Sequence, residues 1–368
     1  MSLKARSAEK SGFFRKFRFK GKSVKKQPVG FYIGSSSVKA VELNPIRNGL
    51  YELVGYGFED LPPDCIMNGA IASPVPIANA ISNIFASQDF KSNDVVASIS
   101  GHAVIVKKIS VHSHENEDLS EAVRWEAGQH LPFDIDDVNF DFRVVDEAAM
   151  TEMVEILFVA AKKDVIQGYA DVFSQAKKNL LTLDVDAFAL LNAYEFNYEP
   201  ENGKVAALLN IGANATTINL ASGTDFLFTR DIGVGGQRYT EFLQKEFNIS
   251  YDQAEALKQG ETIAGVSRTD AQDVIDSVTE IICMEILKTF DFFKSTSSVK
   301  NIDRVLISGG AAHTPGLLGA LNGSLDIPAE EFDSFKRIYV DEKQFPMIKE
   351  QAADMAIAVG LALRSSEE

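Results

Sequence analysis

FYIGSSSVK, residues Phe31 to Lys39, aligns without gaps on LNIGANATT, residues Leu209 to Thr217, 178 positions further along the chain. Each copy consists of an apolar strand, a glycine turn of small polar residues and a second strand. A pattern repeated over such a distance indicates a duplicated unit. We therefore expect two β-hairpins of the same type, one in each half of the protein.

The turns of these hairpins carry the first functional prediction. A P-loop or a dinucleotide fingerprint needs its glycines to open a helix, but here both turns open β-branched strands, so both interpretations fail. Two hairpins that face each other can cradle a phosphate chain with backbone N–H groups and hydroxyls, because glycine permits close approach. The alternative, two ordinary hairpin turns, would be preferred for either copy alone. The repetition makes the interpretation as two ordinary turns less favoured.

Two further glycine clusters follow apolar segments. Ser308-Gly309-Gly310-Ala311-Ala312-His313 comes directly after an apolar strand, where a ligand ring or ribose could lie against bare backbone. Asp231-Ile232-Gly233-Val234-Gly235-Gly236 leads into a predicted helix, whose free N-terminal amides favour an anion. Alone, each cluster is a weak signal.

The charge of the chain is unevenly distributed. Its 368 residues suffice for two to three domains and carry a net charge of −16. Residues 1–28 hold ten Lys or Arg and one acid, whereas the remainder holds 26 basic and 51 acidic residues, a net −25. Duplex nucleic acid requires clustered Lys and Arg on the folded surface. The acidic body therefore argues against nucleic acid as the main partner.

Cysteine content and hydropathy indicate the compartment. Cys65 and Cys283 lie 218 residues apart without CxxC or CxxH spacing, which excludes a disulfide framework and a cysteine-based zinc site. A reducing compartment fits this usage. No apolar run approaches the ~18 residues of a membrane span, and no secretory h-region follows the basic N-terminus. We expect a cytoplasmic protein whose residues 1–28 form a disordered tail.

From Val29 onward, β-rich runs alternate with helical patterns, which predicts an α/β architecture. The predicted strands are Val29–Ile33, Val38–Leu43, Val95–Ile99, Val104–Val111, Val138–Val145, Glu155–Ala161, Val205–Asn210, Thr217–Leu220 and Arg304–Ser308. The predicted helices are Ile77–Phe85, Leu119–Gln129, Val165–Lys178, Ala187–Phe196, Gly236–Phe247, Asp252–Gln259, Ala271–Phe293 and Gln351–Leu363.

In the order of its motifs the chain resembles the actin-like ATPase superfamily, which includes actin, sugar kinases and FtsA. That order is hairpin, hairpin, GVGG, the helix with Ala254 to Lys258, and SGG. Within it, the chain is most similar to the PilM family, cytoplasmic actin-like proteins of type IV pilus assembly. The similarity runs from Val29 to Arg364. It rests on GFYIGSSSVKAVEL from Gly30, EAVRWEAGQHLPFDIDDV from Glu121, FTRDIGVGG from Phe228, SGGAAHTPGL from Ser308 and VGLALR from Val359.

The resemblance implies a duplicated, ribonuclease H-like, two-lobed fold with an inserted subdomain of the FtsA type. The implied divisions are a basic tail at 1–28, lobe 1A at 29–100 and 181–203, and the inserted subdomain 1C at 101–180. Lobe 2A would cover 204–242 and 302–368, with subdomain 2B at 243–301.

The resemblance also implies an ATP or ADP site between the lobes. Its residues would be Gly34, Ser35, Ser36, Ser37 and Lys39 in the first phosphate loop and Asn210, Gly212, Ala213, Asn214 and Thr216 in the second, with Gly235 and Gly236. Glu255 and Lys258 would hold ribose and adenine, and Gly309, Gly310 and Ala311 would cover the purine. Without the resemblance, Glu255 and Lys258 would be interpreted as a solvated i,i+3 charge pair.

The chain departs from the superfamily at the metal-organising positions. An Asp usually precedes the Ile-Gly of each hairpin, and those positions hold Tyr32 and Asn210. Mg²⁺ is normally held through one or two carboxylates plus phosphates, so bound Mg²⁺ is doubtful and hydrolysis is expected to be weak or absent. Asp186 falls near a water-activating acid of related proteins and is the one weak catalytic candidate. A helix N-cap is the preferred interpretation of Asp186.

The histidines offer no competing chemistry. His112 and His114 form an HxH pair beside Glu115, a two-ligand metal face without a third ligand at meaningful spacing, and a polar loop is preferred. No nucleophile elbow or HExxH pattern occurs in the sequence. No metal ligand is therefore assigned.

The favoured hypothesis is an ATP-binding scaffold that binds the N-terminal cytoplasmic segment of PilN, as the resemblance implies. Pilus motor ATPases and a second copy of the chain are further partners considered, and the tail predicts a peripheral position on the inner membrane of a bacterium. The alternatives are an active ATPase or phosphotransferase and an FtsA-like filament protein. FtsA-like proteins carry a C-terminal membrane helix, and the residues after VGLALR do not have that pattern.

Overall fold

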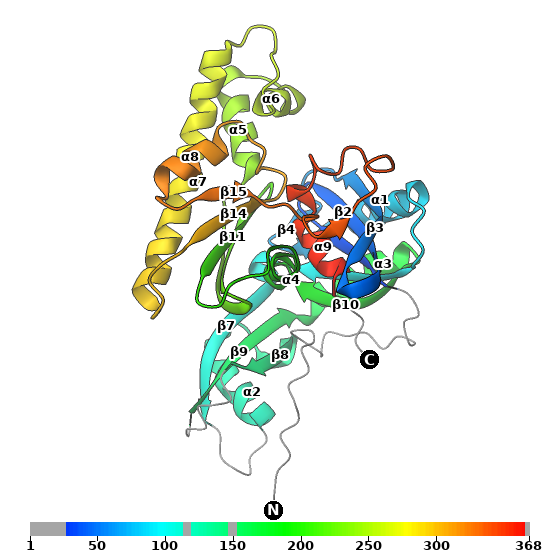
Figure 1. The fold of residues 1–368 in the computed structure, drawn as a ribbon, viewed down its shortest axis with the longest axis vertical. Helices are drawn as coiled ribbons and strands as arrows, with labels where there is room; N and C mark the ends of the chain where they lie inside the picture. The colour runs from blue at the N-terminus through cyan, green and yellow to red at the C-terminus, as the bar shows by residue number, and fades with distance from the viewer. Residues whose placement is uncertain (1–26, 113–118, 146–152, 365–368) are drawn as a thin grey trace, which may run out of the picture.

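The computed structural model describes residues 27–112, 119–145 and 153–364. Figure 1 shows two sheets side by side, with a third, smaller sheet projecting below them. The predicted tail lies almost wholly outside the described residues. Among the described helices, none combines the length and apolar character needed to cross a membrane.

The first sheet has six strands and contains the first hairpin. Its order is β10–β6–β1–β2–β3–β16. The strands are β1 Val29–Ile33, β2 Ser37–Pro45, β3 Tyr51–Asp60, β6 Asp94–Ile99, β10 Asn179–Val185 and β16 Ile338–Tyr339. Helices α1 Pro74–Ser87 and α3 Lys163–Gln175 contact each other and pack through Ile81 and Phe173 into the same apolar core.

The second sheet repeats the central arrangement. Its order is β13–β12–β11–β14–β15, with β11 Val205–Ile211, β12 Thr216–Ser222, β13 Asp225–Ile232, β14 Arg304–Ser308 and β15 Ala329–Glu331. Both hairpins are antiparallel and close identically: the N–H of Gly34 donates to Ser37 O, and that of Gly212 to Ala215 O, each at 2.9 Å. The duplication predicted from the sequence is confirmed.

Four helices accompany the second sheet: α5 Gly236–Phe247, α6 Tyr251–Lys258, α7 Arg268–Thr296 and α8 Leu317–Ser324. Val278, Ile282 and Ile286 of the apolar stripe of α7 are fully buried. It joins one cluster with Leu209 of β11 and Ile307 of β14. The stripe is therefore core, as its helical spacing predicts.

The third sheet, with α2, forms a projection that we call the insert. Its strands are β7 Val104–His112, β8 Val138–Val144 and β9 Met153–Lys162 in the order β7–β9–β8, and α2 is Leu119–His130. Val123 of α2 and Phe158 of β9 belong to a separate apolar cluster. The sequence division at 101–180 also included α3 and the first two residues of β10, but these elements pack on the first sheet.

The C-terminal segment also lies differently from the expected division. Residues 302–368 were assigned to lobe 2A, yet β16 pairs with β3, and Phe335, Ile348 and Val359 belong to the core of the first sheet. The chain therefore returns to the first sheet after β15. Sequence spacing could not reveal this, because the pairing joins residues nearly 290 positions apart.

All predicted strands and helices within the described residues recur, with limited differences at their ends. The predicted helix Gln351–Leu363 is a 3₁₀ turn, Ala353–Met355, followed by α9 Ala356–Ala362. The predicted helix Val165–Lys178 ends at Gln175 because a turn leads into β10. The sequence did not predict β3, β10, β13, α8, the short strands β15 and β16, or the small β4 (Ile66–Met67) and β5 (Ala70–Ile71).

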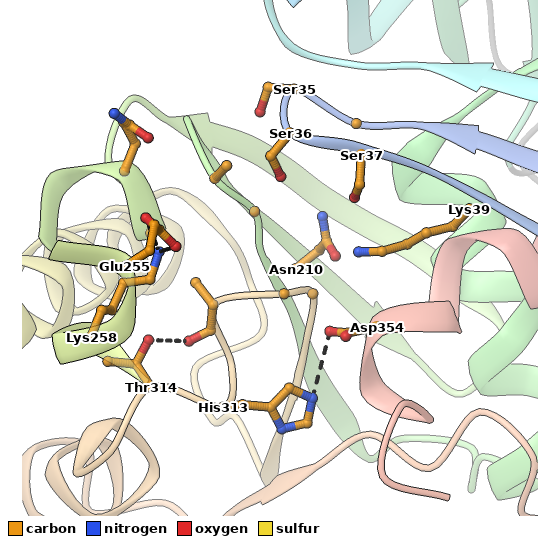
Figure 2. Close-up of a pocket in the computed structure, with 18 of the residues that line it drawn as sticks. Ser35, Ser36, Ser37, Lys39, Asn210, Glu255, Lys258, His313, Thr314 and Asp354 are labelled. Carbon is orange, nitrogen blue, oxygen red and sulfur yellow. Dashed lines mark hydrogen bonds and ion pairs between the residues drawn. The ribbon is translucent and has the colours of Figure 1, made fainter. Parts of the chain in front are cut away.

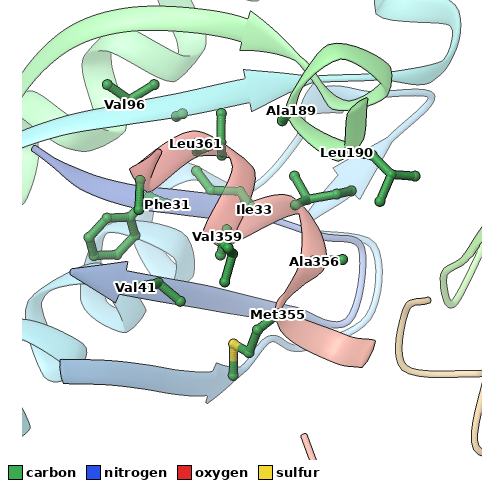
Figure 3. Packing of buried hydrophobic residues seen from close by; sticks show 14 of the residues in the cluster. Phe31, Ile33, Val41, Val96, Ala189, Leu190, Met355, Ala356, Val359 and Leu361 are labelled. Carbon is green, nitrogen blue, oxygen red and sulfur yellow. The ribbon is translucent and has the colours of Figure 1, made fainter. Parts of the chain in front are cut away.

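Two helices, α4 Asp186–Tyr198 and α9, cross between the sheets with direct backbone contact. A Cβ atom placed on Gly360 would lie 1.7 Å from the carbonyl oxygen of Ala189. Figure 3 shows Val359 and Leu361 of α9 near β1 and Ala189 and Leu190 of α4 beside them. Asn219 of β12 donates to Ala187 O at 2.7 Å, so α4 also holds the second sheet.

We predict that Gly360→Ala strongly destabilises the protein, because the methyl group cannot enter without separating α4 from α9. The loss should reach or exceed the ~1–3 kcal/mol of overpacked sites. Urea unfolding followed by circular dichroism measures it. Gly319→Ala in α8 is the matched control, since its Cβ would meet nothing within 4 Å. Equal stability of the two variants would contradict the proposed packing constraint.

Candidate nucleotide site

A cavity of about 290 Å³ lies between the two hairpin turns. The glycine clusters meet there: the N–H of Gly236 donates to Gly212 O at 2.8 Å, and that of Ala311 to Ile211 O at 3.0 Å. Gly309 has φ +90, and a Cβ there would lie 2.6 Å from Ile211 O. Three segments distant in sequence thus form one wall.

Fourteen of the seventeen predicted binding residues line this cavity. They are Gly34, Ser35, Ser36, Ser37, Lys39, Asn210, Gly212, Ala213, Gly236, Glu255, Lys258, Gly309, Gly310 and Ala311.

The other three predicted residues lie elsewhere. Asn214 and Gly235 line an adjoining cavity of about 590 Å³ that also contains Ser35 and Ser36. Thr216 is fully buried, and its hydroxyl donates to Val234 O at 2.8 Å. Thr216 therefore holds the glycine turn in place and lines neither cavity.

The sequence did not predict several lining residues, namely Phe58, Gln237, Tyr251, Gln259, His313, Thr314 and Asp354. Gln259 is the last residue of the predicted helix Asp252–Gln259 and Tyr251 directly precedes that helix, so closeness in sequence to Glu255 and Lys258 was a usable signal. Asp354 comes from the C-terminal segment that returns to the first sheet. Its position depends on that tertiary path and has no local signature.

Lys39 supplies a buried cation to this cavity. Its side chain extends from β2 toward Asn210 (Figure 2) and is only 5% exposed. Burial lowers the pKa of Lys39, while Asp354 and Asp60 act in the opposite direction. Within the described part of the chain, no carboxylate forms an ion pair with its Nζ atom. An anionic ligand would supply the missing partner.

His313 and Asp354 face each other below Lys39. Nε2 of His313 lies 3.5 Å from Oδ1 of Asp354, and Nδ1 lies 3.9 Å from Glu331. Asp354 raises the pKa of His313 against the effect of burial. The pKa of Asp354 is lowered despite the opposing effect of its burial, because His313 and Lys39 stabilise the carboxylate. Asp354 therefore balances two cationic groups at one end of the cavity.

Glu255 and Lys258 form the opposite wall. Lys258 Nζ lies 2.6 Å from Glu255 Oε2, and the side chains are 16% and 24% exposed for Lys258 and Glu255 respectively. Thr240 of α5 also contacts the Glu255 carboxylate. The i,i+3 pair exists, but it lines a cavity and is largely withdrawn from solvent. The alternative of a solvated surface pair is therefore wrong.

Tyr32 and Asn210 do not fit a metal ion held by two carboxylates. Burial is the main reason that the pKa of Tyr32 is far above its usual range, so the hydroxyl stays neutral. Asn210 is a neutral amide, and it lies within hydrogen-bonding reach of Tyr32. Among the described residues, no three His, Cys, Asp or Glu side chains gather as a metal site. His112 lies on β7, whereas His114 and Glu115 fall outside the described residues.

Asp186 does not cap a helix. It is the first residue of α4, Val185 occupies the N-cap position, and no side chain makes a cap hydrogen bond there. Asp186 instead lines a third cavity, of about 310 Å³, behind Tyr32. Its side chain is buried, and its Oδ1 atom has no hydrogen-bond partner within the described residues. The N-cap prediction is wrong because the helix begins at Asp186 itself, one residue earlier than a cap at that position requires.

The Asp186 carboxyl predicts a specific pH dependence of stability. Burial raises its pKa from 3.8 to about 7, and Asp231 and Asp184 add to the rise, while Ser98 and Ser100 oppose it. Between these values the folded state binds more protons than the unfolded state, so the free energy of unfolding falls as pH rises from about 4 to 7. Asp186→Asn should flatten this decline and stabilise the protein more at pH 8 than at pH 4. Urea unfolding at a series of pH values checks this, and an equal effect at both ends would refute it.

Comparisons with known proteins agree with this fold. A solved structure described as a PilM-PilN type IV pilus biogenesis complex matches with a TM-score of 0.83 and 28% identity, covering 94% of this chain and 100% of that one. EutJ of Carboxydothermus hydrogenoformans matches with TM-score 0.55 and 12% identity, covering 92% of this chain and 89% of that one.

MreB5 of Spiroplasma citri, solved bound to AMPPNP, matches with TM-score 0.52 and 11% identity, covering 92% of this chain and 95% of that one. At these identities, EutJ and MreB5 establish the actin-like fold alone. Residues 30–366 match the family of the type IV pilus assembly protein PilM. The chain therefore belongs to the PilM family of type IV pilus assembly proteins.

Proposed function

We propose that this protein is a nucleotide-binding scaffold of type IV pilus assembly that holds ATP or ADP between its two hairpins. The observation that carries the proposal is the cavity closed by both hairpin turns, with the buried Lys39 amine lacking an ion-pair partner among the described residues. A phosphate chain matches both features, because the turns offer backbone N–H groups and Lys39 offers positive charge. The MreB5 structure with AMPPNP shows that a protein of this fold can hold such a ligand.

Binding without efficient turnover follows from the neutral side chains at positions 32 and 210. Phosphoryl transfer relies on metal ions and positioned groups that stabilise developing charge. Neither Tyr32 nor Asn210 contributes negative charge for a metal ion, and Tyr32 lies between the nucleotide cavity and the one containing Asp186. An active ATPase or phosphotransferase is therefore the weaker candidate.

We predict that Lys39→Met lowers ATP affinity about tenfold or more, corresponding to one charge-assisted hydrogen bond of ~1.5–3 kcal/mol. The ligand-free variant should be at least as stable as the parent, because a buried charge is removed. Titration calorimetry and thermal unfolding measure the two effects.

The parent should release phosphate near the background rate. Robust Mg²⁺-dependent turnover that disappears in Lys39→Met would contradict the scaffold proposal.

We further propose that the N-terminal cytoplasmic segment of PilN binds where the insert meets the two sheets. A groove of about 220 Å³ runs there between β7 and β13, lined by Val104, Ile105 and Val106 on one side and Thr229 and Arg230 on the other. Both strands are at the edges of their sheets. Edge strands offer free backbone groups to an extended peptide, and apolar side chains give it pockets. The solved PilM-PilN complex supports this partner.

We predict that Ile105→Glu weakens binding of the PilN peptide at least tenfold and leaves ATP binding unchanged. Ile105 lines the groove but belongs to none of the three apolar clusters, so the fold should survive. Val145→Glu is the matched control, because Val145 is exposed beyond the end of β8, at the other edge of the insert sheet. Fluorescence anisotropy with a labelled peptide measures both. Equal loss in both variants, or in neither, would refute the placement.

A membrane-surface position is the third part of the proposal. Ten Lys or Arg and the residues Phe13, Phe14, Phe17 and Phe19 lie in residues 1–28. Anionic lipid attracts each nearby basic residue by ~1 kcal/mol, and aromatic rings can enter the interface. A basic arm that stays in solvent or folds onto the acidic body is the alternative.

The motor ATPases and a second copy of the chain remain further proposed partners.

We predict that the full chain sediments with anionic liposomes and not with neutral ones. Deleting residues 1–26 should abolish sedimentation, and replacing the four Phe by Ser should weaken it without changing charge. If the Ser variant binds as well as the parent, ring insertion is wrong. If the deletion has no effect, the tail is not an anchor.

A further inference from the structure

A third cavity adjoins both the nucleotide cavity and the β7–β13 groove and lies between them. The cavity of about 310 Å³ shares Tyr32, Gly34 and Asn210 with the nucleotide cavity. At its other side it shares Gly101, Asp186 and Asp231 with the groove. The two sites proposed above are therefore separated by this one cavity, and each shares wall residues with it.

The carboxylate of Asp231 joins two parts of the molecule beside this cavity. Oδ2 accepts from the N–H of Gly101 at 2.8 Å, and Oδ1 accepts from the hydroxyl of Thr217 at 2.6 Å. Thr217 lies opposite Asp231 in the β12–β13 register, so it fixes the carboxylate on the second sheet. Gly101 opens the short 3₁₀ turn that leads directly into β7. The bond to Gly101 thus ties the insert to the second sheet.

The same strand leads directly to the nucleotide cavity. After Asp231 and Ile232, the chain forms the glycine turn 233–236, and Gly236 lines that cavity. This turn is held to the second hairpin by two hydrogen bonds, from Gly236 N to Gly212 O at 2.8 Å and from Thr216 to Val234 O. A ligand that orders the hairpin turn therefore orders the segment that carries Asp231.

Gly101 can respond to the loss of this bond. Its φ is +65, a conformation that other residues rarely adopt, and a Cβ there would meet nothing closer than 3.9 Å. On the side where a Cβ would lie, no atom presses closely on Gly101. The Asp231–Gly101 bond thus joins β13 to the turn that leads into β7, and these two strands line the groove.

We propose that Asp231 couples the two sites, so that a nucleotide between the hairpins strengthens peptide binding in the groove by stabilising the Asp231–Gly101 bond. The inference rests on the proposed function. Both ligands favour the state in which the bond is made, and thermodynamic linkage requires that each raise the affinity of the other by the same factor. Coupling of this kind amounts to about 5–150-fold. Asp231 acts as a positioning residue, because it works through Gly101 and the glycine turn.

The test measures the affinity of a synthetic PilN N-terminal peptide by calorimetry, with and without saturating AMPPNP. In the parent, AMPPNP should raise peptide affinity at least about fivefold. In Asp231→Ala, AMPPNP should change peptide affinity by no more than about twofold. Asp231→Asn keeps an acceptor oxygen and should retain part of the parental increase in peptide affinity. Asp225→Ala, at the exposed far end of β13, is the matched control and should keep the parental factor.

The outcomes distinguish a failure of the coupling from a failure of the proposed scaffold function. A parent that binds both ligands with no mutual effect, or an Asp231→Ala variant with the parental factor, refutes the coupling and leaves the scaffold proposal intact. A parent that binds neither ligand refutes both. Thermal unfolding of each variant excludes a folding defect, and the Asn variant, which keeps the shape of Asp231, distinguishes a positioning role from general loss of structure.

Discussion

The contact between Gly360 and the carbonyl oxygen of Ala189 is the constraint on which the rest of the structure depends. It brings the backbones of α9 and α4 together, and each helix is anchored to a different partner. Gly30 of β1 also lies close to α9, where a Cβ would come within 2.2 Å of Ala358 O. Asn219 of β12 donates to α4. The crossing therefore fixes the distance between the two sheets, and hence between the two hairpin turns.

Once the sheets are fixed, the chemistry of the cavity follows from which groups the turns bring together. Lys39 is buried at a cost that its surroundings only partly offset, since Asp354 is shared with His313. Neutral Tyr32 and Asn210 occupy the positions where a metal-organising acid would make turnover efficient. This combination supports the proposal that the protein holds a nucleotide without consuming it efficiently. A held nucleotide can then serve as a structural element between the lobes and the insert.

The repeated hairpins, the alternation of strands and helices, and most of the cavity wall were predictable because they have local signatures: glycine turns, β-branched runs and helical stripes. Thr216 and Asp186 were misjudged because their roles depend on single hydrogen bonds and on one residue of helix register. Asp354 and His313 could not be found as a pair, since they meet only after the chain returns to the first sheet. Asp231 lay in a recognised motif, but its bond to Gly101 spans 130 residues and has no sequence pattern.

Hydrogen exchange read by mass spectrometry, with and without AMPPNP, tests most directly the claim that both hairpins clamp one nucleotide. The account predicts that amides in residues 34–37, 212–216 and 309–311 become protected together on binding, because they surround one cavity. Protection confined to one hairpin, or none in these segments while calorimetry records binding, would contradict it.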